Sequence, residues 1–404
     1  MTTTTASPTR RELLPWSALL ALGSAVFITS LTETLPAGVL PQLTSSLGVS
    51  SGAAGQAVTV YAAGTALTAV PLAAATAGIR RKPLLLCAMT VFLIANTLTA
   101  AAPGYAVLLC ARFLAGVAAG LAWAILAGYA RRIASPGQEG RAIAIAMAGI
   151  PLALSLGVPA GTLIGQQIGW RASFAAVSAI TLTVIGWIAS SVPAIGLPTT
   201  TVEEPKPTVR ETLRVPGVGA VMVVVVTFVL GHTIIYAYIA PYLRHAGLAT
   251  AVDAILLAFG IACLVSIWYT GRHIDRHLRG LALTAATLFT LATAAFAATT
   301  AQAVVWAAAI AWGLGWGGAP TLLQTAAGHA GMRRGPAVAD TAQAVLVSLW
   351  NAAMALGGII GGVLLQRVDS TADALAAAAL GAFSLLVITL LRKHAFATEE
   401  QDAP

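Results

Sequence analysis

The chain has 404 residues, of which 58% are hydrophobic and only 9% are charged, and its formal net charge is +8. Soluble domains carry about 25% charged residues, so this composition excludes an ordinary soluble protein and predicts an integral membrane protein. The positive charge does not indicate a nucleic-acid partner, because the basic residues lie in short clusters between apolar runs.

Twelve stretches of the chain are long and apolar enough to cross a membrane, which takes roughly 20 residues in a helix. In chain order they lie at approximately 15–39, 52–76, 83–102, 104–129, 142–166, 170–192, 217–242, 250–270, 281–299, 301–324, 337–364 and 371–391. The first resembles a signal peptide, but it is long enough to span and lacks a convincing cleavage site, so we expect it to be retained. Because backbone polar groups must be satisfied within lipid, we predict an all-α protein with twelve transmembrane helices.

The basic residues predict the orientation of these spans. Eighteen of the 22 Lys and Arg residues lie in alternate loops and tails on one side of the membrane, whereas the other side holds only Arg171, Arg244 and Arg367. Lysine and arginine accumulate in cytoplasmic loops. We therefore expect both termini to be cytoplasmic.

A polar, proline-containing stretch, "GLPTTTVEEPKPTVRETLRVPG", divides the spans into six and six. We expect a cytoplasmic tail at 1–14, a six-helix half at 15–195, a cytoplasmic linker at 196–216, a second six-helix half at 217–391 and a cytoplasmic tail at 392–404. A basic turn recurs after spans two and eight, as "AGIRRKPL" and "GRHIDRHLRG". Many secondary transporters have two such halves, with the substrate site between them.

The cysteines and histidines do not form an obvious metal site. Cys87, Cys110 and Cys263 lie in apolar runs, and we expect them to be small core residues rather than disulfide partners or thiolate ligands. His273 and His277 have the spacing of a metal pair on a helix, but they lie in an arginine-rich turn, where solvated loop residues are the simpler interpretation. The chain has no nucleotide-binding glycine loop with a lysine. We therefore expect no cofactor and no ATP hydrolysis.

The loop sequences resemble a signature of the major facilitator superfamily. "GRHIDRHLR" is similar to that signature through Gly271, Asp275, Arg276 and Arg279, which in the family form a gating lock. The equivalent stretch of the first half, "AAATAGIRRKPL", keeps the basic turn but has Ala77 where the family usually has aspartate.

Spans four and five add to the resemblance. "LLCARFLAGVAAG" resembles the intramembrane arginine motif of the family through Arg112, Gly116 and Gly120. "GIPLALSLGVPAGTLIG" is similar to the antiporter motif, through Gly149, Gly157, Pro159 and Gly161. The resemblance implies that the residues of span five form a bend that closes the bundle against proton leak.

"TETLPAGVLPQL", "GWRASF" and "LWNAAMALGGIIGG" resemble the bacterial drug and sugar efflux branch, which contains arabinose-efflux and chloramphenicol-resistance permeases. This resemblance implies a proton-coupled exporter in the bacterial cytoplasmic membrane that works by alternating access. We expect a monomer that handles a small-molecule substrate and protons.

Glu33 is an acidic residue within the outer half of span one. A charge near the centre of a spanning helix costs ~2.5–3.5 kcal/mol on insertion scales, so its presence calls for a partner, a water-filled cavity or protonation. Arg112 in span four lies at a similar depth, and we expect the two residues to pair and to couple transport to protons. The alternatives are an interfacial acid that extends to water and a fixed structural ion pair.

Several polar and aromatic residues within spans are candidates to contact the substrate. We select Glu33, Tyr61, Asn96, Trp123, His232, Tyr236 and Asn351, with Tyr238, Trp312, Trp316, Gln324 and Trp350 as further candidates. The simpler interpretation for tryptophan and tyrosine is an anchor at the membrane interface.

The resemblance implies export of small, fairly apolar drugs such as chloramphenicol-like antibiotics, and an apolar cavity with a single carboxylate favours this interpretation. Sugar or metabolite efflux is the alternative, although a sugar site needs more hydrogen-bonding side chains than these spans offer. A membrane-embedded enzyme is disfavoured, because only one histidine, His232, lies within a predicted span. A receptor without transport activity remains a further alternative.

Overall fold

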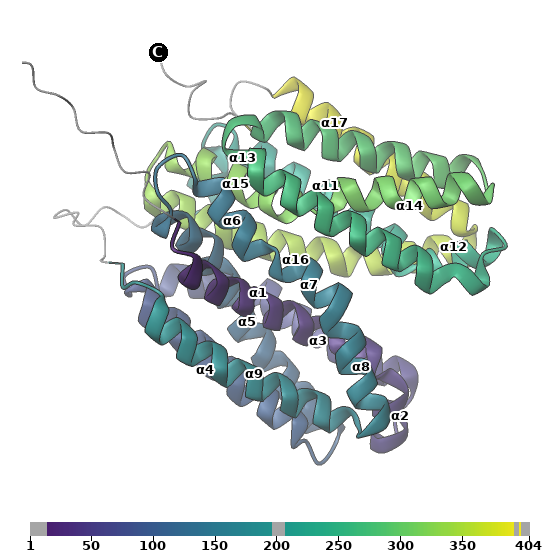
Figure 1. The fold of residues 1–404 in the computed structure, drawn as a ribbon, viewed down its shortest axis with the longest axis horizontal. Coiled ribbons are helices and arrows are strands. Elements are labelled where there is room, and N and C mark those ends of the chain that lie inside the picture. Colours follow the sequence, from purple (N-terminus) through teal and green to yellow (C-terminus); the bar gives the residue numbers. More distant parts are fainter. Residues whose placement is uncertain (1–13, 196–206, 392–395, 397–404) are drawn as a thin grey trace, which may run out of the picture.

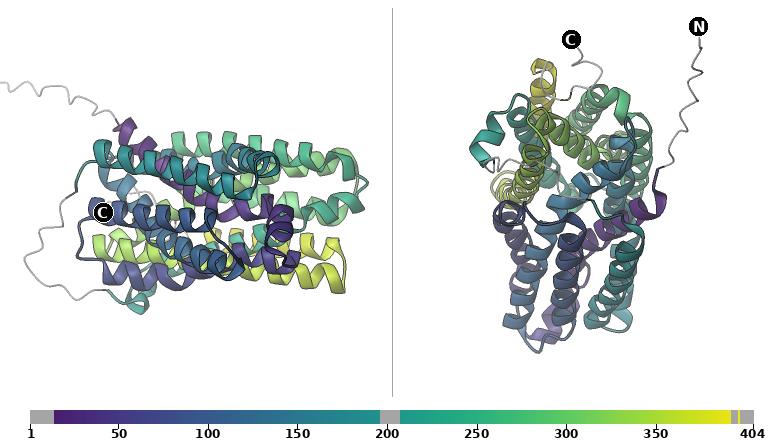
Figure 2. Two further views of the ribbon diagram at one scale, coloured as in Figure 1. Left: turned by 90° about the horizontal axis from the view of Figure 1, so that it is seen from below. Right: turned by 90° about the vertical axis from the view of Figure 1, so that its left-hand side faces the viewer.

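The fold is that of a helical membrane protein built from two bundles. The computed structural model describes residues 14–195, 207–391 and 396, except the side chains of residues 51 and 52. Figure 1 shows the N-terminal bundle (purple to teal) lying against the C-terminal bundle (green to yellow), with most helices running along the long axis. Seen end-on in Figure 2, the two bundles are distinct. Each bundle has its own hydrophobic core.

The N-terminal bundle supplies spans one to six. Its helices are α1 (Trp16–Gly38), α2 (Leu40–Leu47), α3 (Ser51–Ala75), α4 (Arg81–Ala100), α5 (Tyr105–Ile133), α6 (Glu139–Met147), α7 (Gly149–Leu152), the π-helical turn η1 (Ala153–Gly157), α8 (Val158–Gln167) and α9 (Trp170–Ser191). Span five is thus a helix made of α6, α7, η1 and α8, and its backbone stays helical through a π-helical turn.

The C-terminal bundle supplies spans seven to twelve. Its helices are α11 (Val218–Ala237), α12 (Ile239–His245), the 3₁₀ turn η2 (Ala249–Ala251), α13 (Val252–Ala298), α14 (Gln302–Trp316), α15 (Ala319–Met332), α16 (Pro336–Arg367) and α17 (Ser370–Leu390). Eleven described helical stretches are long and apolar enough to cross a membrane, and one of them, Ala249–Ala298, has 50 residues, which is enough to cross twice. The prediction of twelve spans is confirmed.

Two predicted boundaries were wrong. Residues 271–280 were expected to form a turn, but they continue α13, and only His277 has non-helical backbone angles. Span ten was expected to end at residue 324, but α15 continues to Met332, so His329 also lies within a helix. Apolar composition did not reveal this extension, because the added residues are small and polar.

The linker contains a short helix, α10 (Val209–Arg214). Thr208 caps it, and the hydrogen bonds from its backbone N–H and hydroxyl to Glu211 lower the pKa of that carboxyl group. The rest of the predicted linker, 196–206, lies outside the described residues. So do the predicted tails, apart from Leu14 and Phe396.

Glycine allows the helices of the N-terminal bundle to pack closely. A Cβ atom at Gly116 of α5 would clash with the backbone carbonyl of Tyr61 in α3, and one at Gly149 would clash with the carbonyl of Gly23 in α1. Helix association in lipid depends on such close approach of backbones. The cysteines do not share this role: Cys263 is buried, but Cys87 and Cys110 are exposed, so the expectation of three core cysteines was wrong.

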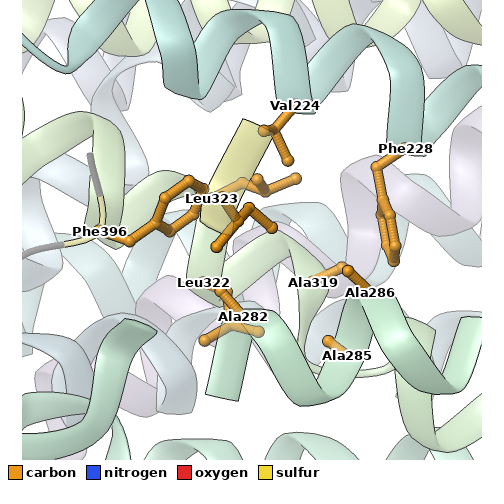
Figure 3. A pocket seen from close by; sticks show the side chains of 10 residues that line it. Val224, Phe228, Ala282, Ala285, Ala286, Ala319, Leu322, Leu323 and Phe396 are labelled. Carbon is orange, nitrogen blue, oxygen red and sulfur yellow. The ribbon is translucent and has the colours of Figure 1, made fainter. Parts of the chain in front are cut away.

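A small apolar cavity of about 250 Å³ lies within the C-terminal bundle, between α11, α13, α15 and α17. Figure 3 shows Val224, Leu323 and Phe396 around it. Phe396 is almost completely buried there, although it lies beyond the last helix. This cavity has no polar side chain among its described lining residues, and it does not combine groups from the two halves.

Candidate functional site

The candidate site is a larger cavity of about 1010 Å³, including its open mouth, between the two halves. Its described lining residues are Ser30, Glu33, Thr34, Trp123, Ile150 and Leu154 from the N-terminal half, and His232, Thr233, Tyr236, Phe259, Trp316, Pro320, Gln324, Leu346, Val347, Trp350, Asn351 and Met354 from the C-terminal half. Glu33 is the one acidic side chain among them. The cavity therefore combines a single carboxylate with walls that are mainly apolar and aromatic.

Pro36 explains how Arg112 is held beside Glu33. In a regular helix the carbonyl of Thr32 would accept a hydrogen bond from the backbone N–H of residue 36, but proline has none. The Nη2 of Arg112 takes this place, donating to the Thr32 carbonyl at 2.8 Å. Its Nε donates to the carbonyl of Ala57 at 3.1 Å. The arginine thus binds the backbone directly beside the carboxylate-bearing residue.

Arg112 is completely buried, and aromatic rings cover its guanidinium group. The group lies 4.7 Å from the ring centroid of Tyr61 and 5.6 Å from that of Phe174. The expected ion pair with Glu33 does not form within 4.0 Å, so this prediction was wrong. Backbone carbonyls bind two guanidinium nitrogens, while the third, Nη1, has no hydrogen-bond partner. The positive charge lies behind α1 and the carboxylate lies at the cavity.

The C-terminal wall of the cavity is a group of stacked aromatic rings centred on His232. The rings of His232 and Trp316 are parallel, with centroids 3.4 Å apart. The Nε1–H of Trp312 donates to Nδ1 of His232 at 3.1 Å. A histidine that accepts at Nδ1 is neutral and carries its hydrogen on Nε2. The wall is therefore rigid and uncharged, and it presents flat surfaces to a ligand.

The structure places most of the predicted substrate contacts around this cavity. Besides Glu33, it brings Trp123, His232, Tyr236 and Asn351 together from both halves. Of the further candidates, Trp316, Gln324 and Trp350 line the cavity, whereas Trp312 lies behind His232.

Tyr61 and Asn96 were wrongly expected to line it. Tyr61 is fully buried under Arg112 and donates its hydroxyl hydrogen to the carbonyl of Thr29 at 3.1 Å. Asn96 is buried within α4, where its Nδ2 donates to the carbonyl of Phe92 at 2.9 Å. Both residues lie at interior depth, but their helix faces point away from the cavity.

Other lining residues were missed because they look like ordinary span residues. Phe259 and Met354 carry no polar signal, and their positions became apparent only once the helices were packed. Ser30 and Thr34 lie three residues before and one residue after Glu33, so the helical repeat does offer a signal for Ser30.

The family model described as Major Facilitator Superfamily matches residues 22–339 of the chain. The chain belongs to the Major Facilitator Superfamily. It is a multi-pass membrane transporter of the cell membrane with cytoplasmic termini, and not an enzyme.

Curated relatives of this superfamily cover almost the whole chain. A chloramphenicol efflux pump of Mycobacterium tuberculosis (strain H37Rv) is 31% identical over 377 residues, which are 91% of this chain and 90% of the relative. The MFS-type transporter YbcL of Bacillus subtilis (strain 168) is 29% identical over 375 residues, covering 90% and 93% of the two chains.

Solved structures of the superfamily share the fold. The proton:xylose symporter XylE, bound to a bromodeoxyglucose, has a TM-score of 0.73 at 16% identity, covering 92% of this chain and 94% of its own. The transporter FucP in its outward conformation has a TM-score of 0.74 at 13% identity, covering 95% and 99%. At this identity the likeness shows the fold alone.

The glycine-rich motif of span five packs against span one of this superfamily member. Gly157 faces the ring of Phe27, and Gly161 faces Leu35. Pro159 stands at the start of α8, directly after the π-helical turn η1. The motif therefore follows a π-helical turn within a helix that lies against the helix carrying Glu33.

The superfamily loop signature fastens the two halves together at their cytoplasmic ends. Asp275 of α13 accepts hydrogen bonds from the backbone N–H groups of Gly140 at 2.5 Å and Arg141 at 3.2 Å. These groups belong to the first turn of α6, so the carboxylate caps that helix, where the helix dipole favours negative charge. We call this contact the Asp275 cap.

The other residues of the signature have different roles in the packing. Gly271 lies against Ala144 of α6. Arg279 donates to the carbonyl of Thr389 in its own half at 3.3 Å, and Arg276 is exposed. The contact between the halves thus depends on Gly271 and Asp275.

We predict that Asp275→Asn slows turnover about fivefold, since a charge at a helix N-terminus contributes about 1 kcal/mol. Asparagine keeps an acceptor for Gly140 but loses the charge. Substrate affinity should remain within a few-fold, because the residue lies away from the cavity. Turnover and affinity are measured with reconstituted protein, and unchanged turnover would remove the gating role.

A second contact between the halves involves Arg81, which follows the first-half loop that contains Ala77. Asp340 at the start of α16 accepts hydrogen bonds from Arg81 at 2.5 Å and from Arg132 at 2.7 Å. Two arginines of the N-terminal half thus share one carboxylate of the C-terminal half. We call these three residues the Asp340 cluster.

We predict that Asp340→Asn shifts the protein toward states with separated cytoplasmic ends. The cluster is partly exposed, so its contribution is on the order of 1 kcal/mol. Spin labels on the cytoplasmic ends of α3 and α16 measure the separation. The double exchange of Asp340→Arg with Arg132→Asp should restore part of the closed population, and a distance distribution unchanged in Asp340→Asn contradicts the prediction.

Proposed function

We propose that this transporter exports small, fairly apolar molecules in exchange for protons, and that drugs of the chloramphenicol type are among its substrates. The observation that carries the proposal is the position of Glu33, the one carboxylate among the described residues that line the cavity. A single carboxylate in a mainly apolar cavity is suited to bind either a proton or a substrate. The proton gradient is then the energy source, and no cofactor is required.

In the proposed cycle, substrate entry between the halves favours release of the proton from Glu33. Arg112 stabilises the resulting carboxylate from behind α1, because an arginine keeps its charge at any physiological pH. Protonation of Glu33 from outside then resets the carrier. Alternating access follows from rocking of the halves, with the Asp275 cap and the Asp340 cluster forming and breaking in each cycle.

The nature of the walls supports drugs over the alternative of sugar or metabolite efflux. Sugars need many hydrogen-bonding partners, whereas Phe259, Trp316, Leu346 and Met354 offer apolar contact. The relative from Mycobacterium tuberculosis is described as a chloramphenicol efflux pump, which makes that compound the first to test.

A drug-susceptibility panel in an efflux-deficient bacterial host tests this function. Expression should raise the inhibitory concentration of chloramphenicol, and a proton uncoupler should abolish accumulation differences between expressing and empty-vector cells. Unchanged susceptibility across the panel, together with sugar efflux from loaded cells, would favour the alternative.

A further inference from the structure

Two amide side chains of the cavity have oxygen atoms without hydrogen-bond partners. Asn351 of α16 is 7% exposed, and its Nδ2 donates to the carbonyl of Val347 at 3.0 Å, while its Oδ1 has no partner. Gln324 of α15 is 4% exposed, and its Nε2 lies 3.0 Å from the sulfur of Met147, while its Oε1 has no partner. Both residues line the cavity.

These contacts determine which atom of each amide group remains without a hydrogen-bond partner. A carbonyl oxygen cannot donate, so the amide atom of Asn351 that faces the Val347 carbonyl is the nitrogen, and its oxygen remains an acceptor. A buried acceptor without a donor is costly, and a ligand that supplies the donor recovers that cost. A site built in this way discriminates strongly against analogues that lack the donor.

The two acceptors lie in the same cavity wall as the aromatic rings. Trp350 directly precedes Asn351 in α16, and its ring centroid is 5.6 Å from that of Trp316. Trp316 in turn stacks on His232. The C-terminal half thus offers flat rings for stacking beside amide oxygens for a donor, whereas the acid of the cavity belongs to the N-terminal half.

We propose that the amide oxygens of Asn351 and Gln324 select substrates that carry a terminal, primary hydroxyl on the side chain of an aromatic ring. This inference rests on the proposed function and assigns a different role to each half of the transporter. The N-terminal half handles the proton through Glu33, and the C-terminal half recognises the substrate.

Thiamphenicol and florfenicol form a matched pair for the test, because they differ only in a terminal hydroxyl that florfenicol replaces with fluorine. Binding to the purified full chain is measured by quenching of tryptophan fluorescence. The wild type should bind thiamphenicol about tenfold more tightly, which corresponds to one hydrogen bond. Asn351→Leu or Gln324→Leu should remove this preference mainly by weakening the binding of thiamphenicol, and measurable binding of florfenicol shows that the variant is folded.

Asn96→Leu is the matched control. Asn96 has the same local bonding as Asn351, with its Nδ2 bound four residues back and its Oδ1 without a partner, but it does not line the cavity. The preference for thiamphenicol should persist in this variant.

The outcomes separate the two proposals. Two results would show that the hydroxyl selection is wrong while the drug-export function stands. In the first, both compounds bind to the wild type with the same affinity. In the second, the preference for thiamphenicol persists in both Asn351→Leu and Gln324→Leu. If the wild type neither binds nor exports either compound, the proposed substrate class fails and the selection fails with it.

Discussion

Glu33→Gln should abolish uphill transport driven by a pH gradient while leaving the protein folded and in the membrane. Glutamine matches the shape and hydrogen bonding of a protonated glutamate, but it cannot release a proton. If Glu33 is the site at which proton and substrate compete, the variant loses coupling. Substrate accumulation in proteoliposomes under an imposed pH gradient, normalised to the reconstituted protein, should fall to the level seen without a gradient.

Two controls accompany this result. Glu33→Asp keeps a titratable carboxylate and should retain part of the coupling. Thr34→Val alters the neighbouring cavity residue, whose hydroxyl is already bound to the carbonyl of Ser30 at 2.9 Å, and should transport at close to the wild-type rate. Concentrative transport by Glu33→Gln at a near wild-type rate would show that another residue couples the proton.

Arg112→Ala should lose transport and also lower the yield of folded protein. The substitution leaves the Thr32 carbonyl buried without a donor, at a cost of about 1–3 kcal/mol, and it removes the charge that stabilises an ionised Glu33. Transport and the amount of monodisperse protein after extraction measure the two effects.

Two further variants separate the backbone contact from the charge. Arg112→Gln keeps N–H donors without a charge, so it should recover yield but not coupling. Pro36→Ala returns a backbone N–H to the Thr32 carbonyl and should therefore rescue the yield of Arg112→Ala. A failure of both variants to recover yield would show that Arg112 does not support α1 through this carbonyl.

The membrane-spanning plan was predictable because lipid imposes it. Apolar runs of sufficient length and the asymmetry of basic residues predicted twelve spans and cytoplasmic termini. The errors occurred where composition carries no such signal. The small, polar end of α15 was missed, and the turn after span eight was misread because α13 continues through it with a single irregular residue, His277.

The site was only partly predictable, because depth can be estimated from sequence but helix rotation cannot. Tyr61 and Tyr236 both lie well inside their spans. Tyr236 is 39% exposed at the cavity, whereas Tyr61 is completely buried, with its hydroxyl bound to the carbonyl of Thr29. The sequence does contain a signal for the Arg112 contact. Pro36 lies four residues after Thr32 and has no backbone N–H to donate to the Thr32 carbonyl, which is therefore free to bind Arg112.

The Asp340 cluster could not be predicted, because Arg81 and Asp340 are separated by 259 residues and meet only once the two halves are packed. Ala77 stands where the family usually has aspartate, but nothing in the sequence indicated that Arg81 would pair with a carboxylate of α16.

The two cytoplasmic contacts differ in their response to ionic strength. Charges on partly exposed side chains are screened over ~8 Å at physiological salt and over shorter distances as salt rises, so the Asp340 cluster weakens. The Asp275 cap keeps its hydrogen bonds to Gly140 and Arg141 under the same conditions. High salt therefore loosens the contact of α16 with α5 and the start of α4 before it loosens the contact of α13 with α6.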